Sequence, residues 1–141
     1  MLVESDQLFF IYRRSCNNVV SRYRINRYEL QFLLALSGFL KHLDRDVVSF
    51  MEFIDTTTKN PKERNKLKGY GWGCINKGFL GSYEYIRVPG SLSIGFSNLG
   101  LRVVTEFHSE LKRLSEKYSF NKTELKEPAS DIYKRIDRVA A

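Results

Sequence analysis

The chain has 141 residues, of which 43% are hydrophobic and 28% charged, and this size and balance predict a single globular domain over residues 1–141. No apolar run approaches the ~20 residues needed to cross a bilayer, and the acidic start MLVESDQLFF argues against a secretory signal, so we expect a cytoplasmic protein. The net charge of +7 is typical of proteins that bind a polyanion.

The basic residues are concentrated in two regions of the chain. Between Tyr12 and Tyr28 there is no acid, and the segment contains five arginines: Arg13, Arg14, Arg22, Arg24 and Arg27. From Pro61 to Gly90, six Lys or Arg residues accompany only two Glu. The cysteines, Cys16 and Cys74, fall on predicted helices away from other ligands at zinc spacing, so we expect buried thiols and neither a metal site nor a cofactor.

Apolar residues at spacings of three and four predict three helices before residue 60. The first covers residues 3 to 23, and the second covers residues 27 to 43 with a leucine stripe. Asp44-Arg45-Asp46 interrupts the pattern, and Asp46 is predicted to cap a short helix that points Val47, Val48, Met51 and Ile54 toward the core. Thr56 to Asn60 would then be a turn longer than the compact helix-turn-helix type.

A capped basic helix is predicted from Asn60 to Asn76. Asn60 suits the N-cap, Pro61 the first helical position and Glu63 the third, where it reaches back as in a capping box. Gly69, Gly71 and Gly73 each cost a helix about 1 kcal/mol relative to Ala, so the sequence leaves open whether this helix is continuous. On a helical wheel Leu67, Tyr70, Gly71 and Cys74 gather on the core side.

The opposite face of this helix is basic and rich in amides. It carries Lys62, Asn65, Lys66, Gly69, Gly73 and Asn76, with Trp72 and Lys68 at its edge. Lysine binds phosphate, asparagine reads adenine, and an exposed glycine lets a bulky partner approach the backbone. We therefore expect double-stranded DNA as the partner of this region, through Lys62, Arg64, Asn65, Lys66, Lys68, Gly69 and Asn76.

A two-stranded hairpin is predicted to follow. The sequence alternates from Tyr83 to Phe96, and Val88-Pro89-Gly90-Ser91 supplies a turn with Pro and Gly at its central positions. Arg87 lies near the tip and is the eighth residue that we expect to contact DNA, in the minor groove or on the backbone. A basic helix followed by such a hairpin is the order of parts in a winged helix-turn-helix.

Helices are predicted again after the hairpin, from Asn98 to Tyr118 and from Pro128 onward. One subunit has little core left to cover so many apolar stripes, which argues for a homodimer with two-fold symmetry. We expect the interface to use the apolar residues of both ends of the chain: Leu8, Tyr12, Leu111, Leu114, Tyr118, Ile132 and Ile136.

Two short segments extend this pattern into a family resemblance. Asn76-Lys77-Gly78-Phe79-Leu80 before the hairpin, and Phe96-Ser97-Asn98-Leu99-Gly100 before the long helix, resemble the layout of MarR-type transcriptional regulators. The resemblance implies a mostly α fold with a β-hairpin wing and dimerisation helices at both ends of the chain. It also implies sequence-specific binding to a pseudo-palindromic site, and a possible small-molecule effector near aromatics such as Phe9, Tyr12 or Phe39.

Other readings of the sequence stay open. One is a winged-helix DNA-binding protein of replication or mobile-element transfer, which would have the same fold. Another is a protein-interaction module whose contact surface contains Tyr70, Trp72, Tyr83 and Tyr85. No enzyme motif is present: Gly69-Tyr70-Gly71-Trp72-Gly73 follows a polar helix and not a strand, so it is no dinucleotide loop, and we expect no catalytic residue.

Overall fold

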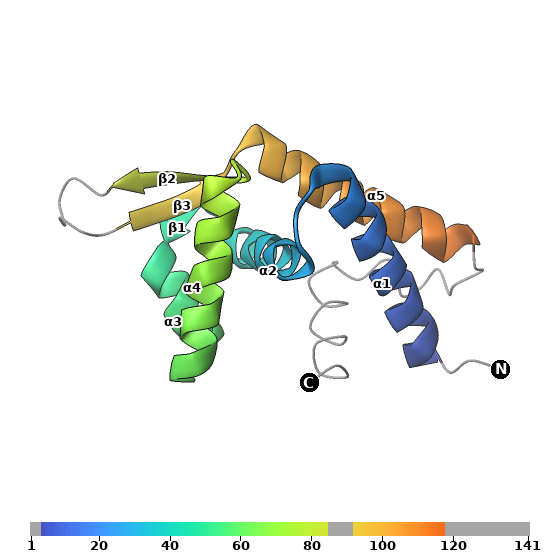
Figure 1. Cartoon of the computed structure of the whole chain (residues 1–141), viewed down its shortest axis with the longest axis horizontal. Coiled ribbons are helices and arrows are strands. Elements are labelled where there is room, and N and C mark those ends of the chain that lie inside the picture. Colours follow the sequence, from blue (N-terminus) through green and yellow to red (C-terminus); the bar gives the residue numbers. More distant parts are fainter. Residues whose placement is uncertain (1–3, 85–91, 118–141) are drawn as a thin grey trace. The chain divides into compact units, whose positions relative to one another are not determined.

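The structure, a computed structural model, describes residues 4–84 and 92–117 (Figure 1). It consists of two compact units, which we call the central unit, Tyr28–Val104, and the terminal unit, Met1–Arg27 with Thr105–Ala141. The described residues are mostly helical with one small sheet, so the predicted fold class is confirmed. The single domain over residues 1–141 stays a prediction.

The terminal unit pairs the first helix with the end of the last one. α1 (Glu4–Tyr23) and α5 (Asn98–Lys117) have the bounds that the sequence predicted to within one residue. Within this unit the Tyr12 and Phe107 rings meet edge to face with their centroids 5.6 Å apart. Arg24 follows α1 with a positive φ of 55°, which ends the helix.

The central unit begins at the second residue of α2 (Arg27–Leu43), whose bounds also match the prediction. Asp44 has a φ of 52°. The Asp44 N–H donates to the Lys41 carbonyl, and the Arg45 N–H donates to the Leu40 carbonyl. These two bonds form a Schellman cap with Asp44 at the left-handed position, so the chain leaves α2 in a fixed direction.

The prediction for residues 46 to 54 was wrong in part. Val47–Ser49 form a strand, β1, and the following helix, α3 (Phe50–Thr57), is capped by Ser49 and not by Asp46. The Ser49 hydroxyl accepts from the Glu52 N–H at 3.3 Å. Val48 and Ile54 are buried as expected, but Val47 and Met51 are exposed. The physical reason is that Val48 pairs with Ile94 of another strand, and this pairing overrides the local helical periodicity.

α4 (Pro61–Asn76) is one continuous helix in spite of its three glycines. Gly78 ends it with a φ of 83°, since its N–H donates to the Ile75 carbonyl while the Phe79 N–H donates to the Cys74 carbonyl. This is a complete Schellman cap. Phe79 and Leu80, which follow this cap, are both buried.

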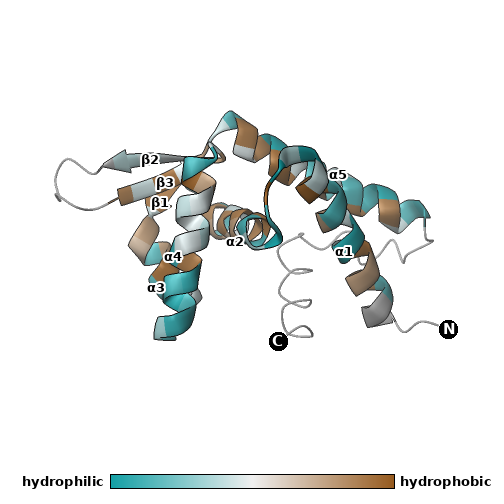
Figure 2. Ribbon diagram, in the orientation of Figure 1, coloured by the Kyte–Doolittle hydropathy of each residue, from teal (hydrophilic) through white to brown (hydrophobic). Residues whose placement is uncertain are grey.

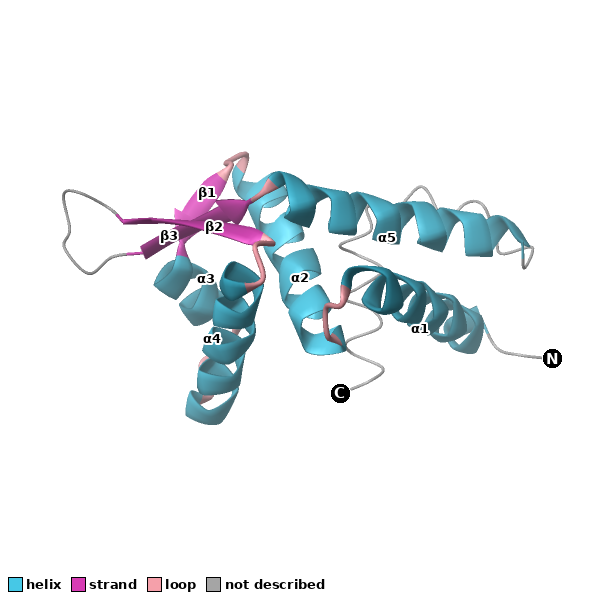
Figure 3. Cartoon of the chain, turned by 45° about the horizontal axis from the view of Figure 1, so that its top comes forward, coloured by secondary structure: helices cyan, strands magenta, loops and turns pink. Residues whose placement is uncertain are grey.

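The sheet has three antiparallel strands in the order β1-β3-β2 (Figure 3), one more than the predicted hairpin. β2 (Leu80–Glu84) and β3 (Leu92–Phe96) form the base of the wing, and the side chain of Ile94 at their centre is fully buried. Ser97 connects this sheet to α5: its hydroxyl donates to the Gly78 carbonyl at 2.6 Å and accepts from the Gly100 N–H at 3.1 Å. The end of α4 and the start of α5 are thus held by one side chain.

Candidate nucleic-acid interface

α3 and α4 form a compact helix-turn-helix. Only Thr58–Asn60 separate them, so the turn is shorter than the sequence suggested. The Asn60 side chain accepts from the N–H groups of Lys62 and Glu63, which confirms the predicted N-cap. The Glu63 carboxylate accepts from the Thr58 hydroxyl, and that hydroxyl accepts from the Asn60 N–H. The capping box therefore closes through Thr58, and it fixes the start of α4 against the turn.

Aromatic rings anchor α3 and α4 to α2. Phe32 of α2 meets Phe53 edge to face at 5.1 Å between centroids and lies 6.1 Å from Phe50. Gly71 lies opposite these rings, because an added Cβ would come within 2.6 Å of Phe50 and 2.9 Å of Phe32. Together with the buried Cys74, Gly71 marks the core side of α4, as predicted, while Leu67 and Tyr70 are half-buried at its border.

Gly73 differs from its predicted position on the polar face. A Cβ at this residue would collide with the carboxylate of Glu29, which is 97% buried, so Gly73 packs against α2. The Lys77 ammonium holds that carboxylate at 2.6 Å. Gly73 therefore packs toward α2, and the charge of Lys77, whose side chain is 43% exposed, is compensated by Glu29.

The exposed side of α4 is a narrow stripe, and Figure 2 shows the first turns of this helix as hydrophilic. Asn65, Gly69, Trp72 and Asn76 follow one another at spacings of four, three and four residues, so they form one line along the helix. All four are exposed, and nothing lies within 4 Å of a Cβ added at Gly69. We call these four residues the α4 stripe.

Lysines flank the α4 stripe. Lys62 and Lys66 are exposed on one side of it, and Lys68 is half-buried on the other. Within the described part of the chain, none of the three ammonium groups makes an ion pair. Arg64 is different, because its guanidinium is bound to the Asp55 carboxylate of α3. Its charge is already compensated inside the helix-turn-helix.

The wing tip lies outside the described residues, and with it Arg87 and the turn from Val88 to Ser91. The described base of the wing exposes Tyr83, whose side chain is 56% accessible. Of the eight residues predicted to contact DNA, the structure thus places six on accessible parts of α4 and one, Arg64, in an ion pair on the same helix.

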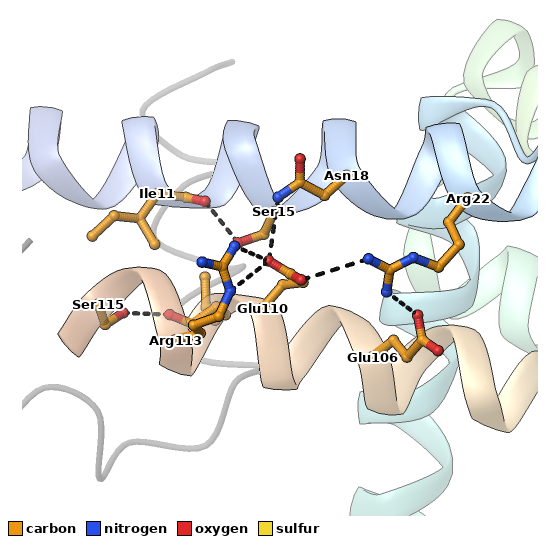
Figure 4. A network of polar contacts seen from close by, with 9 residues as sticks. Ile11, Ser15, Asn18, Arg22, Glu106, Glu110, Arg113 and Ser115 are labelled. Atoms are coloured by element: carbon orange, nitrogen blue, oxygen red, sulfur yellow. Dashed lines mark hydrogen bonds and ion pairs between the residues drawn. The ribbon is translucent and has the colours of Figure 1, made fainter. Parts of the chain in front are cut away.

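A network of polar contacts between side chains joins α1 and α5 within the terminal unit (Figure 4). Arg22 pairs with Glu106 at 2.6 Å, and Glu110 accepts from Arg113 at 2.7 Å and from Asn18 at 3.2 Å. The hydrogen bond from Arg113 is the main reason why the pKa of Glu110 is lowered. Arg22, one of the five arginines of the acid-free segment, therefore has its charge paired within this unit.

The residues predicted for a dimer interface are in part buried already. Tyr12, Leu111 and Leu114 are buried within the single chain and Leu8 is half-buried, whereas Tyr118, Ile132 and Ile136 lie outside the described residues. Phe9, named for an effector site, is 38% exposed, and Phe39 is half-buried against Phe53.

Both cysteines are buried free thiols, as predicted. Burial raises the pKa of Cys16 to about 11 and that of Cys74 to about 12, so neither is a thiolate at neutral pH.

Among residues 4–84 and 92–117 there is no group of three or more His, Cys, Asp or Glu side chains arranged to hold a metal ion. No described helix is long and apolar enough to span a membrane.

The chain resembles solved structures of a bacterial regulator. A MepR mutant of S. aureus bound to an oligodeoxyribonucleotide aligns with 91% of this chain and 89% of its own, with a TM-score of 0.60 and 12% sequence identity. A Se-Met derivative of a MepR mutant from a multidrug-resistant S. aureus clinical isolate aligns with 91% of this chain and 88% of its own, with a TM-score of 0.54 and again 12% identity. MepR is a MarR-family winged-helix regulator, so the resemblance to MarR-type proteins is confirmed at the level of the fold. No protein family and no curated protein matches the sequence itself.

Proposed function

We propose that this protein is a homodimeric transcriptional regulator that binds double-stranded DNA sequence-specifically with α4 in the major groove. The observation that carries the proposal is the α4 stripe, which exposes amide groups between lysines that have no ion pair in the described part of the chain. The MepR mutant of the same fold was solved bound to an oligodeoxyribonucleotide, which supports DNA as the partner.

The roles of the individual residues follow from their chemistry. Lys62, Lys66 and Lys68 neutralise phosphates, which positions the helix without reading sequence. Asn65 and Asn76 offer both a donor and an acceptor to the edge of a base. Gly69 leaves the helix backbone accessible between them, and Arg87 of the wing contacts the backbone or the minor groove.

Arg64 has a different role in this proposal. Because its guanidinium is bound to Asp55, it acts mainly by holding α3 against α4. It contributes less phosphate binding than the lysines beside it.

The dimer is proposed to form through the helices of the terminal unit and the residues that follow Lys117. The apolar side chains Tyr118, Ile132 and Ile136 lie in that segment, and Phe9 adds exposed apolar surface on α1. Deleting residues 121 to 141 should weaken or abolish the dimer, because the interface would lose two of these three side chains. Sedimentation of the truncated chain measures this, and an unchanged dimer would leave α1, α5 and Tyr118 as the whole interface.

Selection of bound sequences from a random pool of duplex DNA tests the function directly. Once a site is known, Asn65→Ala should relax the choice of one base pair per half-site by about 1–3 kcal/mol. Lys66→Ala should weaken binding to all sequences and reduce the salt slope by about one unit. Leu67→Ala, next along the chain but half-buried, is the matched control: it should lower stability with little change in base preference.

Two results would reject the proposal. The wild-type protein binding no duplex DNA at moderate salt would favour a protein-interaction module, for which the exposed Trp72 and Tyr83 are the relevant observation. Tight binding that neither Asn65→Ala nor Lys66→Ala alters would place the DNA contact elsewhere, with the arginines from Arg13 to Arg27 as the next candidates. A replication or transfer role would show itself only in the identity of the selected site.

A further inference from the structure

Trp72 is the least polar residue of the α4 stripe and its only aromatic one. Its side chain is 48% exposed, although tryptophan is among the residues most costly to leave in water. It lies in the same line as Asn65, Gly69 and Asn76, and therefore on the surface that the proposed function directs toward the bases.

The Trp72 indole packs against the ring of Phe50, which holds it in place. Its ring lies 5.9 Å from that of Phe50 with an angle of 33° between the planes, and Phe50 is itself buried against Phe32. One side of Trp72 thus belongs to the aromatic core, while the other side is presented to solvent. A fixed apolar surface loses little conformational entropy when a partner covers it.

Gly69 lies one turn before Trp72 and leaves space beside it. Side chains on a helix lean toward its N-terminus, so the surface that Trp72 covers extends over the turn that contains Gly69. Nothing lies within 4 Å of a Cβ added at Gly69. A flat apolar surface beside an open backbone position is suited to a small apolar group that projects from a groove.

The major groove of DNA offers one such group, the C5-methyl of thymine. We propose that Trp72 makes the apolar contact that selects thymine at one position of each half-site, beside the base pair read by Asn65 or Asn76. This inference rests on the proposed function, because it requires α4 to lie in the major groove.

Replacing each thymine of the selected site with deoxyuridine, one at a time, tests the contact, because only the methyl group is lost. For the wild-type protein one replacement per half-site should lower the affinity about fourfold, which corresponds to the burial of one methyl group. Trp72→Ala should bind the thymine and deoxyuridine sites equally. Trp72→Phe keeps a ring on Phe50, so its loss of affinity on deoxyuridine replacement should lie between that of the wild type and that of Trp72→Ala.

Tyr28 offers a matched control in the same unit. It is also 48% exposed and its ring also rests on another, that of Tyr70 at 5.1 Å, but Tyr70 lies on the far side of α4 from Trp72. Tyr28→Ala should therefore leave the thymine-to-deoxyuridine ratio at its wild-type value.

Fluorescence provides a second measurement that needs no variant, because Trp72 is the only tryptophan in the chain. Binding of the selected duplex should reduce the quenching of Trp72 fluorescence by acrylamide. DNA binding without protection, or a fourfold deoxyuridine effect that persists in Trp72→Ala, would overturn the inference and leave the proposed function intact. Failure of the wild-type protein to bind any selected duplex would instead reject the proposed function itself.

Discussion

Two glycines of α4 should respond in opposite ways to the same substitution. Gly69→Ala and Gly71→Ala are only two residues apart in one continuous helix, and each change adds the helix propensity of alanine, about 1 kcal/mol. At Gly69 the new methyl group meets no atom within 4 Å, so the variant should be more stable than the wild type by up to about 1 kcal/mol.

At Gly71 the new methyl group would press on buried rings. It would meet ring carbons of Phe50 and Phe32, and neither ring has room to turn into solvent because both are almost completely buried. Overpacking of this kind costs about 1–3 kcal/mol. Since the propensity gain is common to the two variants, Gly71→Ala should be less stable than Gly69→Ala by about this amount.

Thermal and urea unfolding of the two purified variants measure the difference directly. For a chain of this length it corresponds to a gap of roughly 3–12 °C in Tm. Equal melting temperatures, or Gly71→Ala melting higher, would refute the packing of α4 on the rings of Phe32 and Phe50. DNA affinity gives an independent readout, because Gly69→Ala should weaken binding to the selected site although it stabilises the fold.

Two further predictions concern ion pairs. Asp55→Ala and Arg64→Ala should each lower the free energy of unfolding by at most about 1 kcal/mol, because both side chains are partly exposed. A double-mutant cycle between them should give a coupling energy of about 0.2–1 kcal/mol. A coupling energy of zero would mean that the pair does not hold α3 to α4. Glu110→Gln should be less stable than the wild type by about 0.5–1 kcal/mol at pH 7. Because the pKa of Glu110 is lowered in the folded state, this difference should be complete above the ordinary carboxyl pKa of about 4.3 and disappear as the pH falls through the folded value. Urea unfolding of both proteins at pH 7 and pH 3 checks the direction, and a difference that grows in acid would contradict the assignment.

The two ends of α4 were predictable because their causes are local. Asn60 and Pro61 specify the start of α4, and Gly78 specifies its end, through bonds that span at most five residues. The continuity of α4 was not predictable in this way. It depends on Gly71 meeting two phenylalanine rings and on Gly73 meeting Glu29, and these neighbours are 21 to 44 residues away in the sequence.

β1 shows the opposite situation, in which a distant contact overrides a local pattern. Val47, Val48, Met51 and Ile54 have helical spacing, and nothing within the segment contradicts a helix. Only the pairing of Val48 with Ile94 makes Val47–Ser49 a strand, and Ser49 then becomes the cap of a helix that starts later. A sequence pattern cannot supply that partner.

Contacts between residues that are distant in the sequence also decide which basic side chains are available for DNA. The segment from Phe50 to Lys77 contains six basic residues, and counting them would suggest six phosphate contacts per subunit. The structure uses two of the six internally, since Arg64 is paired with Asp55 and Lys77 with Glu29. Each neutralised phosphate contributes about 0.9 to the salt slope, so the two counts differ by about two units per subunit. Charge pairing inside the helix-turn-helix, which the sequence does not show, therefore decides how much of the basic composition can act on DNA.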